Sequence, residues 1–376
     1  MNGDLEDRLR DAFAAGAGLV TAERLRPAEQ AVRRRAPGFR RGAFRVLPVL
    51  AAASMAAVIG SVAIVPSLLG NAAGPQPAGV RSPASAQEEE FSAVVDRLAR
   101  RAEQPGRHWR SEIEAVTWGQ VLTQTYNVED RVRTVYWATD PLLMVTTPLS
   151  SRPATAADEK KWRKSGSPDL CGNHIGCETA LLRRGLTGYV RLEKLALSPP
   201  LTPAQLRALP QDPDELRKQL LQLWSAERRA AARSGGPTFE ALPAADMLWA
   251  AGEGILTRTP ATPEVRAAVL RMLAALPGTR IVDNARDADG RRGLALVRRS
   301  ERDPLERQIV LDRTSGAVLG IQSLAVRSGT YAGMGAGDMV RADLVRKLGW
   351  TDSGPVVPED CPKKAGEVCV RPRSAK

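Results

Sequence analysis

Four cysteines and one histidine are the residues whose types and spacing could support metal or redox chemistry. Cys171 and Cys177 flank His174 in CGNHIGC, and Cys361 and Cys369 end the segment CPKKAGEVC. Zinc sites usually have four ligands with more closely spaced pairs, so we expect no metal site and no cofactor. The short spacings favour two local disulfides, Cys171–Cys177 and Cys361–Cys369. Four cysteines allow three connectivities, so pairing between the two segments stays open.

Other motifs in the sequence indicate neither a calcium site nor a catalytic activity. Asp283, Asp287 and Asp289 resemble calcium ligands, but an EF-hand needs a glutamate that closes a twelve-residue loop, and this sequence lacks it in that register. We interpret them as turn residues. The glycines of YAGMGAGD (331–338) have the wrong spacing for a dinucleotide-binding loop. The HExxH, GxSxG and SxxK signatures do not occur in the sequence, so we expect no catalytic residue and a protein that is not an enzyme.

One uncharged stretch, Val46 to Leu69, sets the organisation of the chain. Its 24 residues carry no charge, and a helix of that length at about 1.5 Å per residue crosses a hydrocarbon core of roughly 30 Å. Six arginines between Arg33 and Arg45 precede it, which places the N-terminal side in the cytoplasm. A cleaved signal peptide would have a shorter apolar run of about 7–15 residues close to the N-terminus. We therefore predict a retained single-pass anchor.

This anchor divides the chain into five predicted parts. They are a cytoplasmic tail (1–45), a transmembrane helix (46–69), a flexible linker (70–87), an exterior domain (88–350) and a C-terminal tail with a cysteine pair (351–376). All four cysteines fall on the exterior side, where disulfides persist. The predicted location is the cell membrane, with the C-terminal domain extracytoplasmic.

Charge indicates which partners to expect. The formal net charge is +12, from 45 arginines and only 9 lysines against 42 acidic residues. Nucleic-acid-binding proteins gather basic residues on one face, often beside aromatic ones, whereas these arginines are scattered among acids. We expect no nucleic acid partner, and consider anionic lipid or anionic envelope polymers instead.

The exterior domain begins with one helix and a group of strands. Phe91, Val94, Val95 and Leu98 repeat at helical spacing. Residues 108–145 alternate between polar and apolar or aromatic types, which is typical of antiparallel strands. Five aromatic residues in or near these strands either line a cavity for a hydrophobic ligand or fill an ordinary core: Trp109, Trp118, Tyr126, Tyr136 and Trp137.

A helical block and a second group of strands follow an irregular insert at 149–186. Helix starts are indicated at Asp212-Pro213, near Pro243 and at Thr262-Pro263. Asp289-Gly290 is a strong hairpin signal, and a second strand pair is joined across residues 313–316. The predicted fold class is α+β, with a curved antiparallel sheet packed on helices.

Several segments resemble a family of actinobacterial single-pass membrane proteins of unknown function. They are KKWRKSGSP (160–168), LPQDPDELRKQL (209–220), the segment 263–296 and IVLDRTSGAVLG (309–320). Genes of this family commonly lie beside one for an extracytoplasmic-function sigma factor. The resemblance implies an exterior fold similar to lipoprotein-carrier-like domains, in which a half-open sheet wraps helices. It implies no catalytic or ligand-binding residue, and the two cysteine segments fall outside its pattern.

Two functions fit these expectations. The first is a membrane-anchored, non-enzymatic extracytoplasmic module for envelope sensing or sigma-factor-linked signalling, with the tail 1–45 binding a cytoplasmic sigma factor. That tail contains neither the histidine nor the cysteines of a zinc-binding anti-sigma domain. The second is a carrier or sensor that holds a hydrophobic ligand such as a lipid in the exterior domain.

Overall fold

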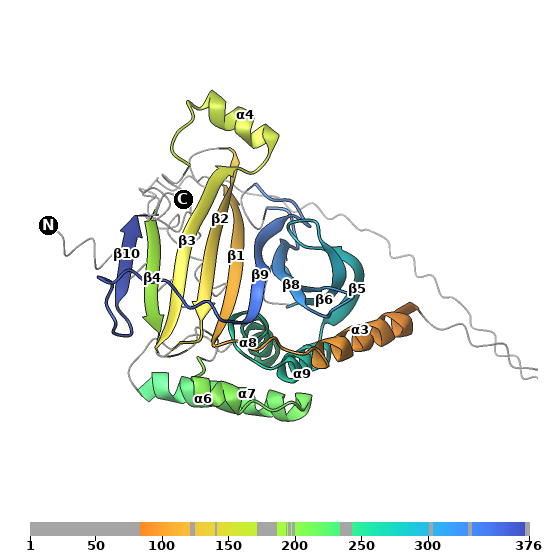
Figure 1. Cartoon of the computed structure of the whole chain (residues 1–376). Coiled ribbons are helices and arrows are strands. Elements are labelled where there is room, and N and C mark those ends of the chain that lie inside the picture. The colour runs from red at the N-terminus through yellow and green to blue at the C-terminus, as the bar shows by residue number, and fades with distance from the viewer. Residues whose placement is uncertain are drawn as a thin grey trace, which may run out of the picture. The chain divides into compact units, whose positions relative to one another are not determined.

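Ten antiparallel strands form one sheet with helices packed against it (Figure 1). The computed structural model describes residues 83–120, 125–139, 141–170, 186–192, 194, 197, 200–233, 243–300, 304–329 and 333–372. The expected α+β class with a large antiparallel sheet is confirmed. The predicted tail 1–45 and anchor 46–69 lie outside the described residues. Within the described ranges, no helix is both long enough and apolar enough to span a membrane.

The sheet consists of two halves that come from different parts of the chain. The first half contains β1 (His108–Gln120), β2 (Asn127–Trp137), β3 (Leu142–Pro153) and β4 (Leu186–Leu192). The second contains β5 (Thr279–Arg286), β6 (Arg292–Arg299), β7 (Leu305–Leu311), β8 (Val318–Ala325) and β9 (Met339–Thr351). The strand order is β10-β4-β3-β2-β1-β9-β8-β7-β6-β5, where β10 is Val368–Pro372. The antiparallel pairing of β1 with β9 therefore joins the two halves.

Local sequence signals explain where the helices start. The helices are α3 (Pro83–Ala99), α4 (Ala156–Lys164), α6 (Pro203–Arg207), α7 (Pro213–Arg233), α8 (Ala244–Arg258) and α9 (Pro263–Ala274). The Asp212 carboxylate accepts hydrogen bonds from the first backbone N–H groups of α7. Thr262 caps α9 in the same way, and α8 begins directly after Pro243. All three predicted helix starts are confirmed.

The main hydrophobic core lies between the helices and one face of the sheet. The predicted face of α3, Phe91, Val94, Val95 and Leu98, is buried there. Helix α8 is buried on nearly all sides, with Met247, Leu248, Trp249, Ile255 and Leu256 all inaccessible to solvent. A helix with apolar residues around its whole circumference belongs in the interior of a domain. Helix α8 thus lies at the centre of this core, and α9 packs against it.

The second half of the sheet curls back on itself. The side-chain amide of Gln322 in β8 donates to the backbone oxygen of Arg286 at the end of β5, at 2.9 Å. The Arg291 guanidinium donates to the backbone oxygen of Leu319 at 2.7 Å. A small separate core of Ala295, Val297 and Val310 is buried within this curl. The curl brings the β5–β6 turn back towards strands that are not its neighbours in the sheet.

The structure differs from the sequence-based expectations in three segments. Helix α3 begins at Pro83, inside the segment expected to be linker. The insert 149–186, expected to be irregular, contains the end of β3 and the helix α4. The segment 351–376, expected to be a tail, contributes β10, which pairs with β4 along Leu186–Val190. An edge strand that pairs with a distant part of the chain has no local sequence signature, which explains this last difference.

A glycine in the β7–β8 turn gives a first prediction. Gly316 has a φ of +71°, and a Cβ at this position would lie 2.6 Å from the backbone oxygen of Val94 and 2.8 Å from the Cβ of Leu98. We expect Gly316→Ala to lower the free energy of unfolding by about 2–3 kcal/mol, because backbone strain adds to overpacking against α3. Chemical denaturation measures this change.

Gly290 provides the matched control. It also has a positive φ, +79°, but a Cβ there would have no neighbour within 4 Å. Gly290→Ala should therefore cost only the backbone strain, roughly 1 kcal/mol. Equal losses for the two variants would contradict the close packing of the β7–β8 turn against α3.

Candidate functional site

The two faces of the sheet carry different kinds of side chain, and the strand register identifies them. Ser111 in β1 lies opposite Tyr136 in β2, and the Ser111 hydroxyl donates to the backbone oxygen of Thr257 in α8. We call this side the helix face. Side chains alternate along a strand, so Glu112 and Glu114 lie on the opposite side, which we call the outer face.

A group of charged side chains lies on the helix face beneath α8. This α8 cluster consists of Glu253 and Arg258 from α8, Arg307 from β7, and Arg341 and Asp343 from β9. Glu253 accepts hydrogen bonds from Trp249 Nε1 at 2.7 Å and from Arg307 Nη1 at 3.4 Å. Asp343 accepts from Arg258 Nη2 at 3.2 Å and from Arg341 Nε at 3.1 Å. The cluster links the central helix to both β7 and β9.

The pKa values of the two carboxyl groups in the α8 cluster are shifted in opposite directions. Burial raises the pKa of Glu253 above its ordinary value, and the neighbouring Arg307 opposes this only in part. Burial also favours a higher pKa for Asp343, but Arg341 and Arg258 outweigh it and hold the pKa of Asp343 below its ordinary value. A group with a strongly perturbed pKa marks a candidate functional position. Glu253 is the carboxyl of this cluster whose charged form is disfavoured by its surroundings.

Tyr136 completes this environment. The Arg258 guanidinium carbon lies 6.0 Å from the centre of the Tyr136 ring, which is within the range of a cation–π contact. The Glu253, Arg258 and Asp343 side chains are 17%, 20% and 12% exposed. Each charge has a partner at hydrogen-bonding distance, which is the condition under which charges are tolerated at such depth.

A second charged group lies on the outer face and connects the curl to the first half of the sheet. This outer cluster consists of Glu114, Glu129, Arg131, Asp289 and Arg346. Arg131 pairs with Glu114 at 2.8 Å and with Glu129 at 2.7 Å, and Arg346 pairs with Glu114 at 2.9 Å and with Asp289. Arg346 is the extra residue of a bulge in β9, and a bulge re-aims a side chain. The outer cluster holds the β5–β6 turn over β1 and β2.

The aromatic residues predicted to line a cavity lie at separate places. Trp109 is fully buried at the start of β1, Tyr136 lies beneath Arg258, and Tyr126 packs under α4 with Val128, Trp162 and Leu170. Trp118 and Trp137 lie on the outer face, where Arg110 stacks on Trp137 at 5.3 Å. In the part of the chain that the structure describes, these five side chains are divided between the two faces of the sheet and the small core under α4. The main core on the helix face of the sheet contains α8.

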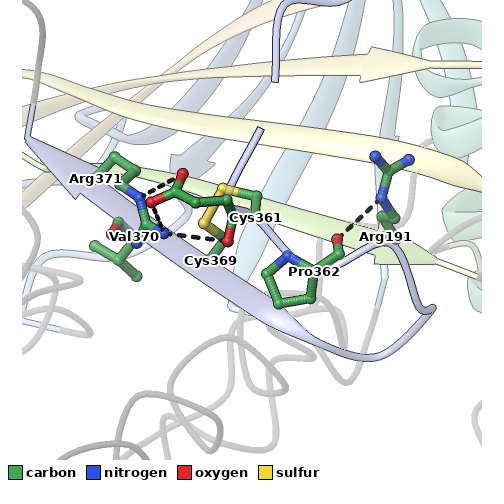
Figure 2. The surroundings of a disulfide bond; sticks show 7 residues. Arg191, Cys361, Pro362, Cys369, Val370 and Arg371 are labelled. Carbon is green, nitrogen blue, oxygen red and sulfur yellow. Dashed lines mark hydrogen bonds and ion pairs between the residues drawn. A yellow bond between two sulfur atoms is a disulfide. The ribbon is translucent and has the colours of Figure 1, made fainter. Parts of the chain in front are cut away.

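The structure contains the predicted Cys361–Cys369 disulfide, with a Cα–Cα distance of 5.4 Å. Both cysteines are buried, and Figure 2 shows the bond beside β10. Arg191 in β4 donates to the backbone oxygen of Pro362 at 3.2 Å, and Arg371 pairs with Asp360 at 2.6 Å. The disulfide thus belongs to the element that attaches β10 to the edge of the sheet. Cys171, His174 and Cys177 lie outside the described residues.

The predicted turn residues have structural partners. The Asp287 carboxylate accepts hydrogen bonds from the backbone N–H groups of Asp289 and Arg291, so it builds the β5–β6 turn as expected. The prediction is wrong for Asp283, which lies in β5 rather than in a turn and pairs with Arg313. Asp289 belongs to the outer cluster. The described residues include no group of three or more His, Cys, Asp or Glu side chains arranged to hold a metal ion.

The α8 cluster was not identified from the sequence, although one signal was available. Glu253 is a lone carboxylate in the apolar run MLWAAGEGIL, and a charge in an otherwise buried helix needs a partner. The cluster lies at the packed interface of α8 with the sheet, whereas a surface hollow lies along α7 beside residues such as Arg217, Gln222 and Arg229. A titrating group in a packed interface responds to acidity through the stability of that interface.

Comparison with models of known protein families finds none that matches the chain, and a search among curated proteins finds no match either.

The raised pKa of Glu253 gives a second prediction. Below the unfolded pKa of about 4.3, Glu253 is neutral in both states, and its stabilising contribution is complete. That contribution is lost as the pH rises through the raised folded pKa. The Glu253→Gln variant keeps an acceptor for Trp249 but does not titrate, so its stability relative to the unmodified chain should increase with pH. Unfolding free energies of both proteins across this pH range test the prediction.

Asp343→Asn is the matched control, because the pKa of Asp343 is lowered. Its contribution is present above the unfolded pKa of about 3.9 and is lost as the pH falls. At neutral pH this substitution removes the negative charge that pairs with Arg258 and Arg341, so it should cost about 3–5 kcal/mol. If both variants show the same pH dependence, the assignment of opposite pKa directions is wrong.

The disulfide gives a third prediction, which concerns the edge of the sheet. Replacing Cys361 and Cys369 by serine should loosen β10 by about 2–3 kcal/mol and leave the main core folded, because β10 pairs with β4 at the edge of the sheet. Hydrogen exchange should accelerate in β10 and along the paired part of β4. Faster exchange throughout β1 and β9 would show instead that the disulfide supports the whole domain.

Proposed function

We propose that the chain is a membrane-anchored, non-enzymatic extracytoplasmic module that takes part in envelope sensing or sigma-factor-linked signalling. The tail 1–45 is the cytoplasmic part, Val46–Leu69 is the anchor, and the domain that begins at Pro83 is exterior. The observation that carries this proposal is the buried Cys361–Cys369 disulfide. Disulfides persist in oxidising compartments and are rare in the cytosol, so this bond supports an exterior position of the domain.

The arrangement of the domain supports a role in sensing. The α8 cluster links the central helix to β7 and β9 through ion pairs that depend on the ionisation of Glu253 and Asp343. A change in acidity or in a bound partner alters the strength of such links. A sensor requires an element whose state depends on outside conditions, and α8 has the contacts for that role. The link to a sigma factor depends on the resemblance to the actinobacterial family.

A topology experiment tests the first part of the proposal. A reporter enzyme that is active only outside the cytoplasm should be active when it is fused after Lys376 and silent when it is fused after Arg41. The reason is that the arginines before Val46 keep the N-terminal side inside. The reverse pattern, or activity at neither position, would refute an exterior domain.

Co-purification tests the signalling part with the same strain. A sigma factor should co-purify with the full chain and should be lost when residues 2–41 are deleted. The deleted chain keeps Met1 and residues 42–45 before Val46, and Arg45 among them still favours the same orientation. Reporter activity after Lys376 must stay unchanged in the deleted chain, which shows that its topology is intact. Absence of any partner that depends on the tail would remove the sigma-factor role and leave the topology untouched.

A further inference from the structure

We propose that α4 is a docking platform for a hydrated linear polyanion of the phosphodiester type. The proposal depends on the function above only for the place where the polymer is met, which is the space outside the membrane. Helix α4 stands at one end of the strands, away from α6, α7, α8 and α9 (Figure 1). It belongs to the insert that was expected to be irregular, so its order needs an explanation.

Lysines gather on this helix although the chain uses few of them. Three of the nine lysines of the chain, Lys160, Lys161 and Lys164, fall within five residues. All three are exposed, as is Arg163. Arg163 pairs with Glu159 at 2.5 Å, whereas none of the three lysines has a carboxylate partner among the described residues. The Lys161 ammonium donates to the backbone oxygen of Thr125 at 3.0 Å. The helix therefore presents a concentrated positive charge to solvent.

Helix α4 is held rigidly, which reduces the cost of ordering it when a ligand binds. Asp158 accepts the backbone N–H of Asn127 at 3.0 Å, and Thr155 caps the helix through the backbone N–H of Asp158. Trp162 packs against Tyr126 and Val128 in a small core that is separate from the main one. A dedicated core for a nine-residue helix fixes the position of its basic side chains.

The chemistry of the helix favours a hydrated polymer over a lipid surface. Helices that bind a bilayer place apolar side chains into it. The aromatic residue of α4, Trp162, turns into the domain instead, where its Nε1 donates to the backbone oxygen of Pro168 at 2.8 Å. The described residues of α4 include no exposed large apolar side chain. Binding through this helix is therefore electrostatic.

Lysine side chains can bind phosphate as the repeating anion. The lysine ammonium is a compact, hydrated point charge that binds phosphate oxygens without a fixed planar geometry. The chain uses the planar arginine fork, which pairs bidentately with carboxylate or phosphate, for its internal ion pairs, whereas α4 presents lysines. Lys160 and Lys164 are four positions apart and lie on one side of the helix. Successive phosphates of a flexible polymer can contact such a row.

Inorganic polyphosphate is the probe for the test, with the full chain purified in detergent. Titration calorimetry at several salt concentrations gives the affinity and its salt dependence. The K160E/K161E/K164E variant should lose at least tenfold in affinity. Its slope of log K against log salt should become less negative by about 0.7 for each lost phosphate contact, the value for a single-stranded polyanion. The K160Q/K161Q/K164Q variant, which adds no negative charge, should give a smaller loss in the same direction.

The control variant makes the same change of charge on another exposed helix. Arg217, Arg229 and Arg233 of α7 are exposed, and R217E/R229E/R233E should retain most of the affinity. Equal losses of affinity in the α4 and α7 variants would show that binding follows net charge and would refute α4 as the binding site. Absence of polyphosphate binding by the unmodified chain would also refute the proposal. Unchanged melting temperatures of the variants confirm that each one folds.

A competition experiment separates the polymer from a lipid source of phosphate. Mixed micelles that contain phosphatidylglycerol should displace polyphosphate weakly at equal phosphate concentration. Stronger displacement by the micelles would contradict the proposal of a polymer ligand and would indicate a membrane surface. The reporter fusions are independent of this measurement. Polymer binding by a chain whose C-terminal domain is cytoplasmic would refute the proposed function and leave the α4 site intact.

Discussion

The pairing of β1 with β9 is the interaction on which the rest of the domain depends. It makes one sheet out of two strand groups that are separated by the whole helical block. Without it, α8 would have a sheet on only part of its surface, because Ser111 in β1 and Asp343 in β9 both contact this helix. The bulge in β9 places Arg346 on the outer face, where it contacts Glu114 and the β5–β6 turn. A single ladder thus positions both charged clusters.

The two clusters show how charge is used differently on the two faces of the sheet. On the outer face, burial opposes the ionisation of Glu129 and Asp289, but arginine partners outweigh it and hold the pKa of each carboxyl below its ordinary value. On the helix face, burial dominates at Glu253 and its pKa is raised. Ionised pairs fasten one surface, whereas the other contains a carboxyl for which the charged form is unfavourable. The difference follows from the number of paired arginines, since Glu129 pairs with both Arg131 and Arg152 whereas Glu253 pairs with Arg307.

Local features of the fold were accessible from the sequence, and non-local ones were not. Asp212 and Thr262 cap the first turn of α7 and α9 by accepting hydrogen bonds from residues two or three positions away. In the β7–β8 turn, Asp312 accepts a hydrogen bond from the backbone N–H of Ser315 within the same loop. The β1–β9 ladder brings together side chains such as those of Glu114 and Arg346, which are 232 positions apart, and no short pattern encodes that choice. The α8 cluster could not be predicted from the sequence for the same reason, because its members are distant in the chain. Glu253 is visible in its helix, but its partner Arg307 comes from another element.

The large sequence separation between β1 and β9 has a consequence for how the protein is made. Long-range strand pairing is slow because the ends of a large loop must meet before any contact stabilises them. During synthesis, β1 and the helices emerge long before β9, so one edge of β1 lacks its neighbour while most of the chain is still being added. Unpaired strand edges favour aggregation. Nascent chains that end before Met339 should therefore be the species that a chaperone has to protect.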